Sequence, residues 1–327
     1  SIMLHITNGD NANQVLQHAG VSGRFLSWAD VLHDGPIPAG LTLDEMSQVR
    51  ANFIHHCGWA SEFEALTHFQ SRDAVFLSSA REGGVVIWNS PELYDQLHLI
   101  QLLSWYNSEA GRHCQPPELV LVPFLLGLAT EEHDLPECLN QRQVVSTEQL
   151  QVAEEAWYAL TASNPRMLAA MLKQDLSCLP YLKSGLQRLA EEYPDLNGIN
   201  RTERQILSIL SGGESAPGSV FRDSQQLESP QFMGDSSFWL VIKRMVESDT
   251  PLIALADGSA FKLPGMFGAD EAFLQQQLLI TDLGAEVLAG DANWLAQRQI
   301  DRWVGGVHLN PENIWCWSAQ NAEFVRV

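Results

Sequence analysis

Short apolar runs alternate with longer helix-like segments over roughly the first 145 residues of the chain. Four runs are expected to form buried strands: residues 3–7, 24–28, 85–88 and 119–123. The segments between them are expected to be helical: residues 12–19, 44–56, 62–79 (as one helix or two) and 92–106. Strands that alternate with helices form open, mostly parallel sheets covered by helices. The pattern therefore predicts a Rossmann-like α/β domain over residues 1–145, with a sheet of about four or five strands.

The helix over residues 92–106 has a recognisable start at Ser90 and Pro91. A serine side chain accepts hydrogen bonds from the free amides of a first helical turn, and proline tolerates the first helical position. We therefore expect Ser90 to cap this helix. Leu93, Leu97 and Ile100 then share one helical face.

The pattern changes after residue 145. A capping box formed by Ser146 and Gln149 opens a helix, and Asn164–Pro165 opens another, which predicts a helical bridge over residues 146–199. A further capping box at Asn200 precedes more elements: helices at 204–210 and 236–247, and strands at 251–255, 277–281, 303–309 and 314–317. Helices followed by a β-ribbon, with a wing-closing segment at 279–284, predict a winged-helix-like α+β domain over residues 200–327.

Composition and charge narrow the class of protein. The 327 residues are 45% hydrophobic and 18% charged, which is typical of a globular chain with roughly two domains. No stretch approaches the roughly 20 uncharged apolar residues of a membrane span, and the start of the chain lacks the features of a signal peptide. A cytoplasmic protein without a membrane partner is expected. The five cysteines, widely spaced and without a Cys-x-x-Cys pair, are expected to be reduced thiols.

The net charge of −21 disfavours nucleic acid as a partner, because such binding depends on neutralised phosphates. The expected helix over residues 236–247 carries only Lys243 and Arg244 as cations. Recognition of DNA by a winged helix normally uses a basic helix. A protein partner or a homodimer contact is therefore more plausible for this region than an operator.

The first candidate for a site is Thr7, Asn8, Gly9 and Asp10, at the carboxyl end of the first expected strand. Ligands of open α/β sheets bind at this edge. Gly9 permits close backbone approach, and the amides of the next helix could hold a phosphate. The Asp10 carboxylate would repel a bare phosphate unless a metal ion or a sugar hydroxyl lay between them. The alternative is that Asp10 or Asn11 only caps the helix.

A second candidate, His33-Asp34-Gly35, follows the second expected strand and should lie at the same edge. A histidine beside an aspartate can act as a general base or a metal ligand. Gly35 and Pro36 would fix the loop that holds them. The alternative is a turn with solvent-exposed polar groups.

The third candidate is Glu92, Asp95 and Gln96, at the start of the helix that follows the third expected strand. Glu92 and Asp95 share a helical face, although the helix dipole alone also favours carboxylates there. The topology places all three candidates around one crevice. Its carboxylates could bind a divalent metal, with Asp10 and Asp34 as tentative ligands, or could divide into an acid and a base.

The motifs of the common enzyme classes are missing from the sequence. It contains no Walker loop, no Gly-x-Gly-x-x-Gly, no Gly-x-Ser-x-Gly and no His-Glu-x-x-His. The residues instead resemble a bacterial family whose N-terminal domain is known as domain of unknown function 1835. The segments that carry the resemblance are 4–10 (Leu-His-Ile-Thr-Asn-Gly-Asp), 28–36 (Trp-x-Asp-x-Leu-His-Asp-Gly-Pro), 93–97 (Leu-Tyr-Asp-Gln-Leu), 201–204, 234–239 and 305–309.

The resemblance covers most of the chain but implies no activity. The chain also departs from the family pattern at residues 89–92, which read Asn-Ser-Pro-Glu where the family commonly has Phe-Glu-His-Asp. If that glutamate and histidine perform chemistry in the family, this member either acts differently or only binds a ligand.

Two functions follow as hypotheses. In the first, the N-terminal domain binds a small polar or phosphate-bearing ligand, with hydrolase- or transferase-type chemistry that a metal could assist. Asp10 and Asp34 would serve as metal ligands or acid/base groups and His33 as the alternate base, while Asn8 and Gln96 would orient the ligand. In the second, the protein is a ligand-sensing regulator or adaptor that contacts its partner through the C-terminal domain.

Overall fold

The computed structural model describes residues 2–265 and 267–327, and the chain divides into two compact units. Unit 1 contains the residues up to Arg188 together with Trp303–His308, and unit 2 contains Leu189–Arg302 and Leu309–Val327. The expected bridge of residues 146–199 is therefore divided, because its residues up to 188 belong to unit 1 and the remainder to unit 2. None of the described helices is long and apolar enough to cross a membrane.

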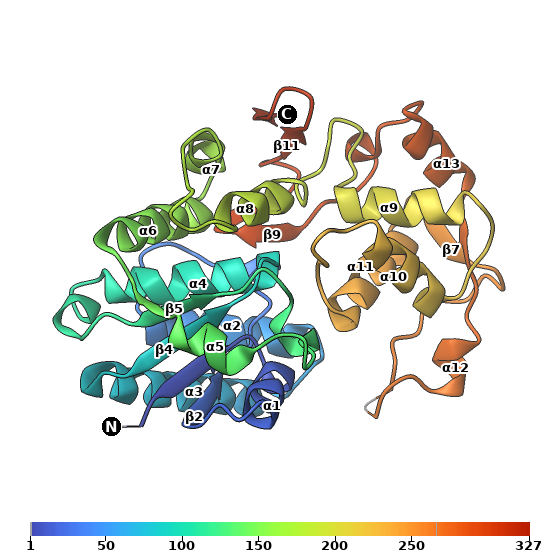
Figure 1. Ribbon diagram of the computed structural model, residues 1–327. Coiled ribbons are helices and arrows are strands. Elements are labelled where there is room, and N and C mark those ends of the chain that lie inside the picture. Colours follow the sequence, from blue (N-terminus) through green and yellow to red (C-terminus); the bar gives the residue numbers. More distant parts are fainter. Residues whose placement is uncertain (1, 266) are drawn as a thin grey trace. The chain divides into compact units, whose positions relative to one another are not determined.

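Unit 1 is built on a five-stranded sheet in the order β2-β1-β4-β5-β6 (Figure 1). Its strands are β1 (Leu4–Thr7), β2 (Arg24–Ser27), β4 (Val85–Asn89), β5 (Glu118–Leu121) and β6 (Gln143–Val144). The first four strands are parallel, and β6 pairs antiparallel with β5 at the edge. The predicted Rossmann-like, mostly parallel sheet is confirmed.

The helices that connect these strands are α1 (Asp10–His18), α2 (Leu43–His56), α3 (Glu62–Glu82), α4 (Leu93–Tyr106) and α5 (Leu135–Asn140). After β6 come α6 (Thr147–Thr161), which packs on α4, and then α7 (Arg166–Met171) and α8 (Leu182–Ala190). The connections β1-α1-β2 and β4-α4-β5 run in opposite directions along the sheet. Right-handed crossovers then place α1 and α4 on opposite faces. Consistently, Leu16 of α1 belongs to the same buried cluster as Val86 and Trp88. These two residues of β4 are two positions apart, so they lie on the same face of the sheet.

Most of the expected helices and strands lie within one or two residues of their predicted positions, and the capping boxes at Ser146 and Asn200 are both present. The prediction that Ser90 caps α4 is wrong. The N-cap is Glu92, and the Ser90 backbone N–H donates to the Asp95 carboxylate instead. Ser90 therefore belongs to a turn that precedes the helix.

The expected strand over residues 303–309 is divided in two by Gly305 and Gly306. Its halves, β9 (Arg302–Gly305) and β10 (Val307–Leu309), form a small sheet in which β3 (Gly35–Pro36) pairs parallel with β9. Gly305 has a positive φ of 58°, and a Cβ on Gly306 would lie 1.9 Å from the backbone oxygen of Thr161. Only glycine allows this close backbone approach to the end of α6.

Unit 2 has the element order of a winged helix. Three helices, α9 (Arg201–Leu210), α10 (Pro217–Gln226) and α11 (Asp235–Glu247), precede the antiparallel strands β7 (Ile253–Leu255) and β8 (Leu278–Ile280). An isolated bridge between Ser215 and Leu278 adds a third strand position beside β8. Further elements are α12 (Glu271–Leu274), α13 (Asp282–Ala289), β11 (Trp315–Ser318) and β12 (Glu323–Arg326).

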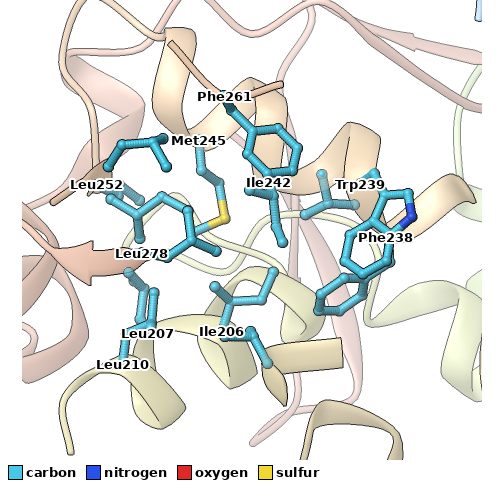
Figure 2. Close-up of a cluster of buried hydrophobic side chains, with 14 of the residues drawn as sticks. Ile206, Leu207, Leu210, Phe238, Trp239, Ile242, Met245, Leu252, Phe261 and Leu278 are labelled. Carbon is cyan, nitrogen blue, oxygen red and sulfur yellow. The ribbon is translucent and has the colours of Figure 1, made fainter. Parts of the chain in front are cut away.

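The core of unit 2 lies between these helices and the β7–β8 ribbon. Figure 2 shows Ile206 and Leu210 facing Ile242, Met245 and Leu278. The predicted winged-helix-like α+β region is confirmed. Helix α10 was not predicted, because the Gly- and Ser-rich segment around its start is typical of a turn. Pro217 at the first helical position is nevertheless a signal for the start of a helix.

A buried ion pair fixes the loop between β2 and α2. Arg50 of α2 binds the Asp30 carboxylate through Nε at 2.9 Å and Nη2 at 2.9 Å. The same guanidinium donates to the backbone oxygens of Asp34 at 2.8 Å and Val31 at 3.0 Å. Both charged side chains are only 1% exposed. One arginine therefore neutralises a buried carboxylate and satisfies the backbone of the loop.

Replacing Arg50 with leucine is expected to lower the free energy of unfolding by about 3–5 kcal/mol, because Asp30 would stay buried without a counter-charge. Chemical denaturation followed by tryptophan fluorescence measures the change. The matched control is Arg81→Leu on the exposed side of α3, which should change stability by no more than about 0.5 kcal/mol. Equal effects of the two substitutions would contradict the role given to Arg50.

Candidate functional site

The strand order of the unit 1 sheet reverses between β1 and β4. The connection from β1 leads to β2 on one side, whereas β4 leads to β5 on the other. Segments that leave neighbouring strands in opposite directions open a crevice at the carboxyl edge of the sheet, where ligands of open α/β sheets bind. Asn8 follows β1, and Asn89 ends β4, so both lie at this edge.

Asn8, Glu92 and Asp95 meet at this edge and are named here the carboxyl cluster. The Asn8 side-chain amide donates to Glu92 Oε1 at 2.9 Å and to Asp95 Oδ1 at 2.7 Å. Glu92 is the N-cap residue of α4, and Asp95 lies in the first turn of the same helix. Asp95 is 2% exposed, and Glu92 is partly buried. The predicted topology thus brings these three residues together.

The two carboxyl groups of the cluster do not ionise together. Burial, followed by the charge of Asp95 and a hydrogen bond to it, raises the pKa of Glu92 to about 9. Burial also raises the pKa of Asp95, but hydrogen bonds from Glu92, Asn8 and Ser90 oppose that rise. The hydrogen-bond donors favour the charged form of Asp95 over that of Glu92, and Glu92 keeps a proton at neutral pH. The N-terminus of α4 adds a favourable dipole for the charge on Asp95.

Side chains behind the cluster hold the Asn89–Ser90 turn in place. The Gln96 amide donates to Asn89 Oδ1 at 2.7 Å and to the Ser90 backbone oxygen at 2.7 Å. The Asn89 amide donates to the Asp95 backbone oxygen at 2.8 Å, and the Ser90 hydroxyl accepts from the Leu126 N–H at 3.1 Å. Gln96, an expected ligand contact, is therefore engaged in positioning the turn.

Asn89 and Ser90 were not among the predicted site residues. Both contact Asp95 through backbone or amide groups. The sequence feature that could have indicated them is a pair of polar residues at the end of a fully buried strand. The Asn89–Ser90 turn thus supplies hydrogen bonds to Asp95 of the carboxyl cluster.

The predicted residues around the start of α1 form a separate chain of hydrogen bonds. The Thr7 hydroxyl lies within hydrogen-bond distance of two acceptors, Asn13 Oδ1 and the Gly9 backbone oxygen, and can donate its one proton to either. Asn13 donates to the Ser27 hydroxyl at 2.9 Å, which in turn donates to Asp10 Oδ1 at 2.6 Å. Asp10 is exposed. The carboxylate is thus directed toward the end of β2.

Helix α1 begins without a side-chain cap. Its N-cap is Gly9, which has no side chain to accept from the first-turn amides, and the Gly9 N–H itself donates to the Thr7 hydroxyl at 3.4 Å. The alternative that Asp10 or Asn11 caps the helix is therefore wrong. Nothing lies within 4 Å of a Cβ built on Gly9, so close approach to another part of the chain does not explain the glycine. Free amides and an open approach are the features that an anion uses at a helix N-terminus.

His33 and Asp34 are buried in the loop that Arg50 holds. They are 2% and 7% exposed, so the alternative of a turn with solvent-exposed polar groups is wrong. The Asp34 carboxylate accepts from the Gly35 N–H at 2.9 Å. Gly35 has a φ of 80°, and a Cβ there would lie 2.5 Å from the Phe53 ring, which gives this glycine a packing role.

The Asp30 loop also contacts α4. His98 Nε2 lies 2.7 Å from the Asp30 backbone oxygen, and the rings of His98 and Tyr94 are 4.3 Å apart. Complete burial lowers the pKa of His98 to about 4, so this histidine is neutral at physiological pH. The helix that carries Glu92 and Asp95 is therefore anchored to the loop that carries His33 and Asp34.

A metal site was expected at Asp10 and Asp34. Among residues 2–265 and 267–327, no group of three or more histidine, cysteine, aspartate or glutamate side chains is placed to hold a metal ion. Asp10 instead binds Ser27, and Asp34 binds the backbone of its own loop.

A cavity of about 850 Å³ runs along α1. One wall is a single face of α1, from Asn11 in its first turn to His18 in its last, and the other is the segment between Gly127 and Pro136. The carboxyl cluster does not line it. The cavity nevertheless starts at the carboxyl edge of the sheet, because Asn11 and Gly127 follow β1 and β5 closely.

The fold and the site define a Rossmann-like α/β unit with a buried carboxyl pair at its topological switch point, followed by a winged-helix-like unit. No family model matches the chain, and no curated protein shows significant similarity to it.

The raised pKa of Glu92 makes stability depend on pH. Between about 4.5 and 9 the folded chain keeps a proton that the unfolded chain releases, so the free energy of unfolding should fall as pH rises through this window. The slope from one group is at most about 1.4 kcal/mol per pH unit. Glu92→Gln, which keeps the size and a donor, should reduce the slope.

Urea denaturation at a series of pH values measures this effect. The matched control is Glu82→Gln on the exposed end of α3, which should keep the slope of the unaltered protein. A slope unchanged by Glu92→Gln would show that Glu92 ionises normally.

Proposed function

We propose that unit 1 binds a small polar ligand at the carboxyl cluster and that Glu92 donates a proton to it. The observation that carries the proposal is the meeting of two carboxyl groups on one amide: Asn8 donates to Glu92 at 2.9 Å and to Asp95 at 2.7 Å. Burial raises the pKa of Glu92 to about 9, which favours its protonated form at neutral pH. Enzymes obtain an acid and a base from two carboxyl groups by separating their pKa values in this way. The sheet edge where the pair lies is also where such folds bind ligands.

The chemistry that fits is hydrolase- or transferase-type. A protonated Glu92 can give its proton to a leaving oxygen, and Asp95 stays ionised beside it. The uncapped amides at the start of α1 suit a phosphate group on the same ligand. Asp10 is bound to Ser27, which holds its carboxylate by a hydrogen bond. In this proposal Asn8 orients both carboxyl groups, and no metal ion is required.

The ligand would extend into the cavity beside α1, which has a volume of about 850 Å³ and mixed polar and apolar walls. Membership of the family that carries domain of unknown function 1835 is proposed on the segments around residues 4–10, 28–36 and 93–97.

A regulator or adaptor is the second candidate function, and the winged-helix order of unit 2 is the observation that favours it. Helix α11 occupies the position of a recognition helix. Its Lys243 forms an ion pair with Glu247 at 3.0 Å, so this cation is already neutralised. Together with the net charge of −21, this favours a protein partner over nucleic acid.

A thermal-shift screen against nucleotides, sugar phosphates and divalent metal ions tests the proposed ligand site. A compound at about 100 times its dissociation constant adds about 2.7 kcal/mol of stability. We expect a sugar phosphate or nucleotide to stabilise the unaltered protein and Asn8→Ala to lose that shift. Asn52→Ala on the exposed side of α2 is the matched control and should keep it.

Turnover of the stabilising compound then tests the role of Glu92. Glu92→Gln should still bind the compound but should lose about 10²–10⁴-fold in rate, because the amide has no acidic proton to transfer. A ligand whose shift survives in Asn8→Ala binds elsewhere, and an undiminished rate in Glu92→Gln would remove Glu92 from the chemistry.

A further inference from the structure

Unit 2 gathers arginines in a cavity of an otherwise acidic protein. The sequence has 19 lysines and arginines against 40 aspartates and glutamates. Arg244, Arg298 and Arg302 nevertheless line one cavity of about 330 Å³. They come from the last turn of α11, from the segment after Trp294 and from the start of β9. This cavity shares no residue with the carboxyl cluster and belongs to the other unit, so its proposed role does not depend on the proposed function.

Two of the three arginines have carboxylate partners. Arg298 lies 3.5 Å from Glu203, donates to the Gly198 backbone oxygen at 3.1 Å and stacks 3.9 Å above the Trp294 ring. Arg302 binds Glu192 through its carboxylate at 3.1 Å and its backbone oxygen at 2.9 Å. These contacts hold both guanidinium groups in fixed positions.

Arg244 differs from them. It is partly buried, and in the described part of the chain its side chain makes no hydrogen bond and no ion pair. It also lines a smaller, separate cavity, together with Arg298 and Arg302 and their partners Glu203 and Glu192. Arg298 and Arg302 are therefore each paired with a buried carboxylate, whereas Arg244 is not. A guanidinium carries five donors that require acceptors when water is scarce.

The charges inside the cavity influence one another. Burial is the main cause that lowers the pKa of Arg298, and the nearby cations Arg244 and Arg302 lower it further, whereas Glu203 raises it. A bound anion would relieve this repulsion. Three acidic residues also line the cavity, namely Glu247, Asp249 and Asp301, and all are exposed. Exposed carboxylates at the rim admit a small anion but repel a polyanion such as DNA.

We propose that this cavity of unit 2 binds a small oxyanion, a phosphate or carboxylate group, through Arg244, with Arg298 and Arg302 completing the positive wall. The guanidinium fork matches the geometry of both kinds of group. A volume of about 330 Å³ suits a small metabolite. A winged-helix-like unit with such a site can respond to a metabolite.

The test uses the full chain and three salts at matched ionic strength: sodium phosphate, sodium succinate and sodium chloride. Isothermal titration and thermal shift should show saturable binding of phosphate or succinate, and the responding salt identifies the group. Arg244→Gln should weaken that binding by about tenfold or more. Arg222→Gln, an exposed arginine on α10, is the charge-matched control and should leave the binding unchanged.

Arg244→Gln should also leave the stability without anion unchanged, because this arginine has no partner to lose among the described residues. Its Nε resonance in ¹⁵N spectra, identified by its absence from Arg244→Gln, should shift on titration of the unaltered protein. Equal responses to all three salts, or anion binding that Arg244→Gln does not weaken, would overturn the proposal.

Discussion

Two carboxyl groups buried three residues apart on one helix cannot both carry a charge without a counter-ion. Repulsion between them adds to the cost of removing each from water. In unit 1 the pair of Glu92 and Asp95 meets this constraint by retaining a proton and by accepting hydrogen bonds from Asn8 and Ser90. The position of the turn after β4 and of the first turn of α4 depends on this arrangement, because each of its donors comes from those segments or from the end of β1.

The same constraint explains the other buried charges. Asp30 is neutralised by Arg50, and Asp73 by its neighbour Arg72, whose guanidinium lies 3.7 Å above the Trp28 ring. In unit 2, Arg302 and Arg298 are balanced by Glu192 and Glu203. The protein therefore pairs its buried charges with side chains from distant or adjacent positions. The protonated Glu92 and Arg244, whose side chain has no partner among the described residues, are the groups at which we propose ligands.

Much of unit 1 could be predicted, because four buried strands and their helices are each long enough to show a pattern. The two-residue strands β3 and β6 are too short for that. The division of β9 from β10 depends on backbone contact with Leu160 and Thr161, about 145 residues earlier in the chain, which no local pattern contains. Helix α10 could not be predicted, because the Gly- and Ser-rich residues before Pro217 are typical of a turn.

Part of the candidate site could be predicted from the sequence in the same way, and part could not. The meeting of Asn8 with Glu92 and Asp95 follows from topology, because the loops after parallel neighbouring strands share an edge. Arg50 could not be predicted as the ion-pair partner of Asp30, because the path of the loop that brings α2 back to Asp30 does not follow from any local pattern. Nor could the sequence show that Asp10 binds Ser27, or that His33 and Asp34 lie in a loop closed by an arginine. These facts depend on side-chain contacts between elements.

The most direct measurement of the central claim is a pH titration of the glutamate side-chain carboxyl carbons by ¹³C NMR, on the full chain labelled in glutamate. We predict one glutamate resonance that titrates near pH 9 and is absent from Glu92→Gln. A spectrum in which every glutamate titrates in the ordinary range would contradict a shared proton at the carboxyl cluster.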